Sequence, residues 1–90
     1  MNKGELVDAI AAKASVTKKD ADAILTATLN AIVEAVVAGD KVTIVGFGTW
    51  EPRQRQTRRG RNPKTGAELT IPAMRIPAFS AGKGFKDKVS

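Results

Sequence analysis

The chain has 90 residues, of which 15 are Lys or Arg, 9 are Asp or Glu and none is Cys or His, so its formal net charge is +6. Without Cys and His, disulfides, thiol nucleophiles, imidazole bases and the usual zinc sites are excluded, so we expect no enzyme, no metal site, no cofactor and no small-molecule substrate. This length predicts a single domain, and the positive charge favours a polyanionic partner. No apolar run approaches the roughly 18 residues of a membrane span, so we expect a cytoplasmic protein without a membrane partner.

The first 40 residues predict two helices. Asn2 precedes Glu5 by three residues, which is the spacing of a capping box at the start of a short helix. Thr17 and Asp20 repeat this spacing at the start of a second helix, and Gly39 suits a left-handed C-terminal stop. Because this half holds four basic and six acidic residues, a net charge of −2, the positive charge of the chain must lie further on.

The second helix carries an apolar stripe that is wider than packing against one neighbour requires. Many hydrophobic residues of the chain are alanines, and so small a core often needs a second subunit when disulfides and metals are absent. We therefore expect one side of this helix to pack on its own sheet and another on a second copy of the chain. The stripe comprises Ile24, Leu25, Leu29, Ile32, Val33, Val36 and Val37.

Strand patterns follow the second helix. β-Branched residues at 42–45 lead into the Gly-Phe-Gly sequence at 46–48, which is typical of a tight turn, and a second strand resumes at 49–51. These segments predict a hairpin. At the end of the sequence, the spacing of apolar residues in 80–89 predicts a short helix.

The basic charge concentrates at 53–64, where five Arg and one Lys occur without an acidic residue. The segment 60–66 is dense in turn-forming residues, and 69–76, which contains Pro72, predicts a returning strand. We therefore expect an elongated two-stranded ribbon, which has too little apolar surface to be stable in water unless a partner binds it. A strand period of two would place Arg53, Arg55, Arg59 and Arg61 on one face of this ribbon and Gln54, Gln56 and Arg58 on the other.

The abundance of arginine indicates what this partner is. The planar guanidinium matches phosphate oxygens and enters a narrow minor groove better than lysine does. A basic run also fits a solvated surface or a disordered tail, but turn residues at a fixed place favour nucleic acid. Pro63 has two compatible roles at the tip. It can shape the turn, which the residue type alone favours, or act as a rigid wedge that unstacks a base step and kinks the duplex.

Five motifs occur in the second half of the chain, within a resemblance that covers nearly all 90 positions. They are GFGTW at 46–50, GRNPKTG at 60–66, IPA at 71–73, PAF at 77–79 and GK at 82–83. Together they resemble the bacterial histone-like HU family, which is related to integration host factor. The heptapeptide at 60–66, placed between two hairpins, is the most specific of the five.

The resemblance implies an α+β fold that forms an intertwined homodimer. Two N-terminal helices would form its base, followed by a three-stranded antiparallel sheet with a long protruding β-ribbon arm and a short C-terminal helix. Residues 1–90 would be a single HU-type DNA-binding domain. Its parts would be a helical dimerisation half at 1–40, sheet segments at 41–52 and 69–80, the DNA-binding arm at 53–76 and the C-terminal helix at 81–90.

The resemblance also implies a nucleoid-associated architectural protein that binds double-stranded DNA in the minor groove with little sequence preference, bends it and compacts the bacterial chromosome. Bent, nicked or flexible DNA should bind best. Pro63 would intercalate. The implied DNA-binding residues are Arg53, Arg55, Arg58, Arg59, Arg61, Asn62, Pro63, Lys64, Arg75, Lys3, Lys83 and Lys86. The implied dimer core consists of Leu29, Ile32, Val36, Phe47, Trp50 and Phe79.

Two alternative functions remain at this point. One is a site-specific DNA-bending factor like integration host factor, which would use the same fold with added sequence readout. The other is an RNA-binding or general polyanion-binding module. The predicted arm has no aromatic residue on which an unpaired base could stack, which weakens the single-stranded version of this second alternative.

Overall fold

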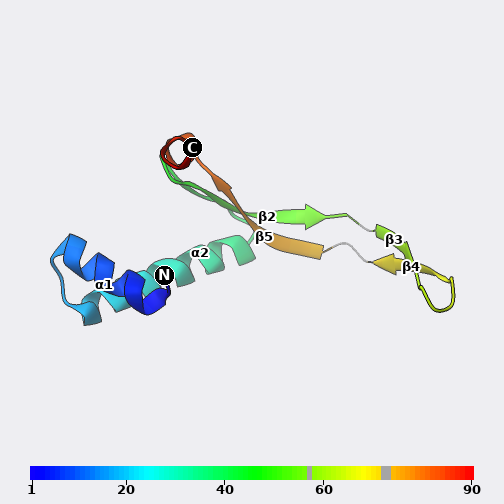
Figure 1. Ribbon diagram of the computed structural model, residues 1–90, viewed down its shortest axis with the longest axis horizontal. Coiled ribbons are helices and arrows are strands. Elements are labelled where there is room, and N and C mark those ends of the chain that lie inside the picture. Colours follow the sequence, from blue (N-terminus) through cyan, green and yellow to red (C-terminus); the bar gives the residue numbers. More distant parts are fainter. Residues whose placement is uncertain (57, 72–73) are drawn as a thin grey trace. The chain divides into compact units, whose positions relative to one another are not determined.

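The computed structural model describes residues 1–56, 58–71 and 74–90 (Figure 1). Its elements are α1 (Lys3–Ala14), α2 (Lys18–Val37), β1 (Val42–Ile44), β2 (Gly48–Arg55), β3 (Arg58–Arg61), β4 (Glu68–Ile71), β5 (Met74–Ala81) and α3 (Lys83–Val89). No helix in these ranges is long and apolar enough to cross a membrane. The chain divides into two compact units, residues 1–34 and 35–90.

The first unit contains α1 and most of α2, and both predicted helix starts are confirmed. The side-chain oxygen of Asn2 accepts a hydrogen bond from the backbone N–H of Glu5 at 2.9 Å, and that of Thr17 accepts one from Asp20 N–H at 3.1 Å. Each cap satisfies one of the N–H groups that a helix start leaves without an intrahelical acceptor.

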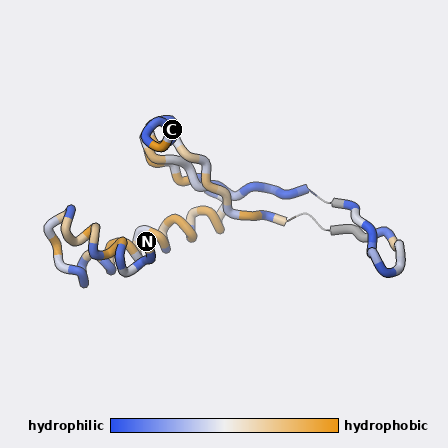
Figure 2. Tube along the Cα trace, in the orientation of Figure 1, coloured by the Kyte–Doolittle hydropathy of each residue, from blue (hydrophilic) through white to orange (hydrophobic). Residues whose placement is uncertain are grey.

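A small apolar core holds the two helices of this unit together. Among the described residues, the buried hydrophobic ones are Val7, Ala11 and Ala21, and Ile10 and Leu25 pack against them. This core is too small to cover the apolar stripe of α2, which Figure 2 shows as a largely hydrophobic segment. The single chain leaves several members of that stripe exposed: Ile24 (57%), Leu29 (45%), Val33 (59%) and Val37 (65%).

The predicted stop of the second helix at Gly39 is also confirmed. Gly39 has a φ of 93°, and its N–H donates to the carbonyl oxygen of Val36 at 3.0 Å. The N–H of Asp40 donates to the carbonyl oxygen of Ala35 at 2.9 Å. These two bonds form a Schellman motif, which pairs the last carbonyls of the helix and favours glycine because the backbone is left-handed there.

The second unit is built on an antiparallel sheet of three strands in the order β1-β2-β5. The predicted tight turn joins β1 to β2: Phe47 N–H donates to Ile44 O at 3.0 Å, and Gly46 has a φ of 80°. β1 pairs only with residues 48–50 of β2, whereas β5 pairs with the whole of β2. The outer half of β2, residues 51–55, therefore forms a two-stranded ribbon with β5.

A second two-stranded ribbon, β3 with β4, lies further along the predicted arm (Figure 1). Its register pairs Arg59 with Thr70 and Arg61 with Glu68. The described residues of the returning strand expected at 69–76 belong to β4 and β5. Pro72, which the sequence analysis placed in this strand, lies outside the described residues.

The C-terminal helix lies within the segment in which the sequence predicts it. β5 continues to Ala81, which pairs with Gly48 of β2. Gly82 N–H then donates to Phe47 O at 2.8 Å, and α3 starts at Lys83. Pairing with β2 thus keeps the residues just before α3 extended.

Candidate nucleic-acid interface

The register of β2 with β5 gives the sheet one aromatic and one polar face. Trp50 is opposite Phe79, and Thr49 is opposite Ser80. Because side chains alternate along a strand, Thr49, Glu51 and Arg53 share the face that carries Ser80. The sheet therefore has one face of aromatic rings and one face of charged and hydroxyl side chains.

The aromatic face holds α3 against the sheet. Ring centroids lie 4.8 Å apart for Trp50 and Phe79, 5.6 Å for Phe47 and Trp50, and 5.1 Å for Phe47 and Phe85. These spacings are typical of stabilising aromatic pairs. Three of the rings belong to the predicted dimer core, whereas Phe85 of α3 was not included in that prediction, although its helical spacing from Val89 was visible in the sequence.

The predicted dimer-core residues are incompletely covered within one chain. Leu29 is 45% exposed, and Phe47 and Phe79 are each 42% exposed. The other three, Ile32, Val36 and Trp50, are partly buried. Large apolar side chains with this exposure are expected where a second surface completes the packing.

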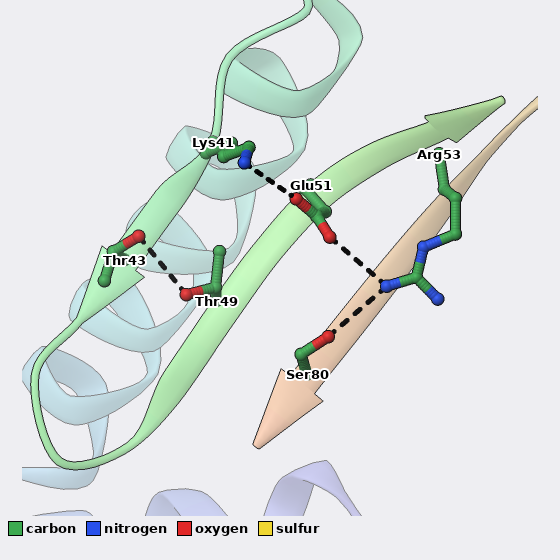
Figure 3. A network of polar contacts seen from close by, with 6 residues as sticks. All are labelled: Lys41, Thr43, Thr49, Glu51, Arg53 and Ser80. Carbon is green, nitrogen blue, oxygen red and sulfur yellow. Dashed lines mark hydrogen bonds and ion pairs between the residues drawn. The ribbon is translucent and has the colours of Figure 1, made fainter. Parts of the chain in front are cut away.

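The polar face carries a network of charged side chains and hydroxyls (Figure 3). Glu51 lies between two cations: its Oε2 is 3.3 Å from Lys41 Nζ, and its Oε1 is 3.2 Å from Arg53 Nη2. The same Arg53 nitrogen donates to Ser80 Oγ at 3.3 Å. The hydrogen bonds from Arg53 and Lys41, together with their charges, hold the pKa of Glu51 below its ordinary value.

The predicted basic residues of the arm lie on β2 and β3. Arg53 and Arg55 share a face of β2, and Arg59 and Arg61 share a face of β3. Arg58 begins β3. Arg59 Nη1 lies 3.5 Å from Glu68 Oε1, and both side chains are largely exposed, so water screens this pair.

Hydrogen bonds connect the two sides of the β3–β4 loop. Asn62 N–H donates to Ala67 O, and Gly66 N–H donates to Asn62 O, both at 2.8 Å. The side-chain oxygen of Asn62 accepts from Lys64 N–H at 2.9 Å, and Gly66 has a φ of 69°. These bonds fix the backbone on both sides of Pro63, which is exposed together with Lys64. The loop can therefore present a rigid apolar ring beside a cation.

The remaining predicted binding residues lie away from this loop. Arg75 of β5 donates from Nη2 to the carbonyl oxygen of Val37 at 3.0 Å, so it pairs an end carbonyl of α2. Lys3 belongs to the first unit, where Nζ donates to Thr26 Oγ1 at 3.0 Å and lies 3.7 Å from Asp22 Oδ1. Lys83 and Lys86 are exposed on α3.

Comparison with known proteins identifies relatives over the full length of the chain. DNA-binding protein HU of Nostoc sp. is 68% identical over 90 residues, which is 100% of this chain and 96% of that protein. DNA-binding protein HU of Clostridium pasteurianum is 51% identical over 90 residues, which is 100% of this chain and 99% of that protein.

Solved structures agree with these sequence relationships. A cocrystal structure of Anabaena HU with DNA has a TM-score of 0.92 and 68% identity, and the match covers 100% of this chain and 98% of that chain. HU from Thermotoga maritima has a TM-score of 0.71 and 38% identity, and the match covers both chains completely. These matches confirm the resemblance to HU and the α+β fold. The family model described as bacterial DNA-binding protein matches residues 1–90, and this chain therefore belongs to that family.

Proposed function

We propose that this chain is a non-enzymatic architectural protein that binds double-stranded DNA with little sequence preference and bends it, and that it thereby compacts the bacterial chromosome in the cytoplasm. The observation that carries the proposal is the β3–β4 loop, where exposed Pro63 and Lys64 lie on a hydrogen-bonded backbone next to the arginine-rich strand β3. The 68%-identical Anabaena HU was crystallised with DNA, which supports the same class of ligand for this chain.

Phosphate contacts supply most of the affinity in this proposal. The arginines of β2 and β3, with Asn62 and Lys64 at the loop, would contact the minor groove and its phosphates, and Arg75 and the lysines at 3, 83 and 86 would contact flanking phosphates. The lack of acidic residues at 53–64 leaves this segment strongly positive. Such contacts carry no sequence information by themselves, which is why we expect little sequence preference.

The bend would come from Pro63. A rigid apolar ring inserted between two base pairs unstacks one step at a cost of roughly a few kcal/mol, and the bent duplex then reaches more protein surface. Because flexible, mismatched or nicked steps are easier to unstack, such duplexes should bind more tightly than continuous ones.

We also propose that the functional unit is a homodimer. Its interface would use the exposed apolar residues of α2 and the aromatic face of the sheet, since one chain leaves Leu29, Phe47 and Phe79 each more than 40% exposed. In this assembly residues 1–40 dimerise, 41–52 and 69–80 contribute the sheet, 53–76 form the arm and 81–90 complete the C-terminal end.

The experiment that tests the function measures binding of the purified chain to several unrelated labelled duplexes, continuous and nicked, over a range of salt concentrations. Equal affinities for unrelated sequences, tighter binding to nicked DNA and a slope of log K against log salt near −0.9 per neutralised phosphate are expected. A strong preference for one sequence would instead indicate a site-specific bending factor, and preferential competition by RNA would indicate an RNA-binding module.

A further inference from the structure

Glu51 is an acidic residue placed inside an otherwise cationic and hydroxyl-bearing surface. Its side chain is 23% exposed, whereas those of its two partners, Lys41 and Arg53, are 69% and 53% exposed. Lys41 approaches one carboxylate oxygen, and Arg53 approaches the other (Figure 3). Both cations are thus held by an internal anion while their side chains remain open to solvent.

The hydrogen-bond donors around Glu51 are of the kinds that commonly bind phosphate. Arg53 Nη2 bridges the Glu51 carboxylate and the Ser80 hydroxyl, and Figure 3 shows the other terminal nitrogen of Arg53 pointing away from Glu51. The hydroxyls of Thr43 and Thr49 lie 3.2 Å apart on the same face. Lysine, arginine and hydroxyl side chains are the groups that most often contact DNA phosphates, and the Glu51 carboxylate occupies the acceptor position that a phosphate would take.

The ion pairs of Glu51 are of a kind that a stronger anion can replace. Lys41 and Arg53 each keep more than half of the side chain exposed, so water and salt screen their pairs with Glu51 and reach both cations. A DNA phosphate belongs to a dense array of negative charge, so it competes well for the same cations once the duplex is bound nearby. The position of Arg53 on the strand that also carries Arg55 makes this surface continuous with the proposed arm.

We propose that Lys41 and Arg53 form a second phosphate-binding patch, on the polar face of the sheet, and that Glu51 competes with the DNA backbone for both cations. The inference rests on the proposed function and deepens it: duplex binding exchanges the Glu51 carboxylate for a phosphate oxygen, with Ser80 as an additional hydrogen-bonding group. Glu51 then loses its two cationic partners and takes up counterions from solution. The presence of Glu51 therefore weakens duplex binding and makes the duplex affinity less dependent on salt. Neither Lys41 nor Glu51 was among the binding residues predicted from the sequence.

The test is the substitution Glu51→Gln, which keeps the size of the side chain and its hydrogen-bonding oxygen but removes the charge. Duplex affinity at low salt should rise about three- to tenfold, and the slope of log K against log salt should become steeper, because no Glu51 carboxylate remains to take up counterions when the duplex binds. The matched control is Glu34→Gln, which removes the same charge from an exposed position of α2 and should change affinity less than about twofold through the screened long-range field.

A double-mutant cycle distinguishes competition for the two cations from the general effect of removing one negative charge. In an Arg53→Gln background the gain from Glu51→Gln should shrink, and in an Arg53→Gln, Lys41→Gln background it should disappear, because no cation remains to be released. Equal gains from Glu51→Gln and Glu34→Gln, or an undiminished gain in the double background, would overturn the inference. Fluorescence of the single tryptophan, Trp50, reports whether each variant keeps the packed aromatic face.

The outcomes distinguish this inference from the proposed function. If the unsubstituted chain binds duplex DNA and Glu51→Gln brings no gain, the competition is refuted while the proposed function stands. If neither the unsubstituted chain nor any variant binds duplex DNA at low salt, the proposed function is refuted and the inference fails with it.

Discussion

The side-chain oxygen of Asn62 accepts a hydrogen bond from the backbone N–H of Lys64 at 2.9 Å, so the chain is tied to itself across Pro63. The Thr65 hydroxyl accepts from Ala67 N–H at 3.2 Å on the returning side of the same loop. The loop that would meet DNA is therefore shaped by its own side chains before any ligand binds. Asn62, which the sequence suggested as a DNA contact, has a role within the loop.

The first prediction concerns this tie. Asn62→Ala should leave Lys64 N–H without its side-chain acceptor, at a cost of about 0.5–1.5 kcal/mol to the ordered loop. The temperature dependence of the Lys64 amide proton shift should increase accordingly in the free protein. Asn62→Ser is the matched control, because a serine hydroxyl can accept the same bond more weakly. Identical amide behaviour in the unsubstituted chain and the alanine variant would contradict the role assigned to this side chain.

The second prediction concerns the close packing of Gly48 on β5. A Cβ at this residue would lie 2.5 Å from Phe79 Cζ and 2.6 Å from Ser80 O, so Gly48→Ala should destabilise the fold by about 1–3 kcal/mol. Gly60→Ala is the control, since no atom of the part of the chain that the structure describes lies within 4 Å of a Cβ there. Denaturant unfolding followed by Trp50 fluorescence, at equal protein concentrations because a dimer is proposed, measures both. Equal stability of the two variants would show that the sheet does not pack in this way.

The third prediction assigns a structural role to Arg75. Its hydrogen bond to Val37 O places a cation at the C-terminal end of α2, where the helix dipole favours positive charge. Arg75→Gln should therefore lower the free energy of unfolding by about 0.5–2 kcal/mol. Arg59→Gln, which breaks a long and exposed pair with Glu68, should change it by less than about 0.5 kcal/mol. Thermal unfolding compares the two, and a larger loss at Arg59 would refute this assignment.

The fourth prediction is a dependence of stability on pH. Because Arg53 and Lys41 lower the pKa of Glu51 in the folded chain, its ion pairs stabilise the fold fully above the ordinary carboxyl pKa of 4.5. This contribution is lost as the pH falls below 4.5 and through the lowered pKa of the folded state. Urea unfolding between pH 7 and pH 3 should show a smaller acid-induced loss for Glu51→Gln than for the unsubstituted chain. Parallel curves for the two proteins would mean that the carboxylate gains nothing from its partners.

The sequence correctly predicted the features that depend on hydrogen bonds between residues close together in the chain. The caps at Asn2 and Thr17 and the stop at Gly39 depend on residues within one or two turns, and all three occur as expected. The start of α3 depends instead on a distant contact, because Ala81 pairs with Gly48 and the helix begins only at Lys83.

The same distinction applies to the candidate site. The arginines and the loop were visible as a basic run and a cluster of turn residues, whereas the partners of these side chains were not. Arg53 meets Ser80, and Arg75 meets Val37, across 27 and 38 residues of sequence. Only the register of β2 with β5 and the path of the chain after α2 bring such groups together, and the sequence pattern specifies neither.

The measurement that tests the central claim most directly is resonance energy transfer between the two ends of a labelled duplex. Binding of the unsubstituted chain should raise the transfer on several unrelated sequences, because a proline wedge kinks DNA by about 20–90°. Pro63→Ala should lose most of this increase while keeping most of the affinity, since the phosphate contacts remain. Unchanged transfer on binding, or an equal increase with Pro63→Ala, would contradict bending by Pro63.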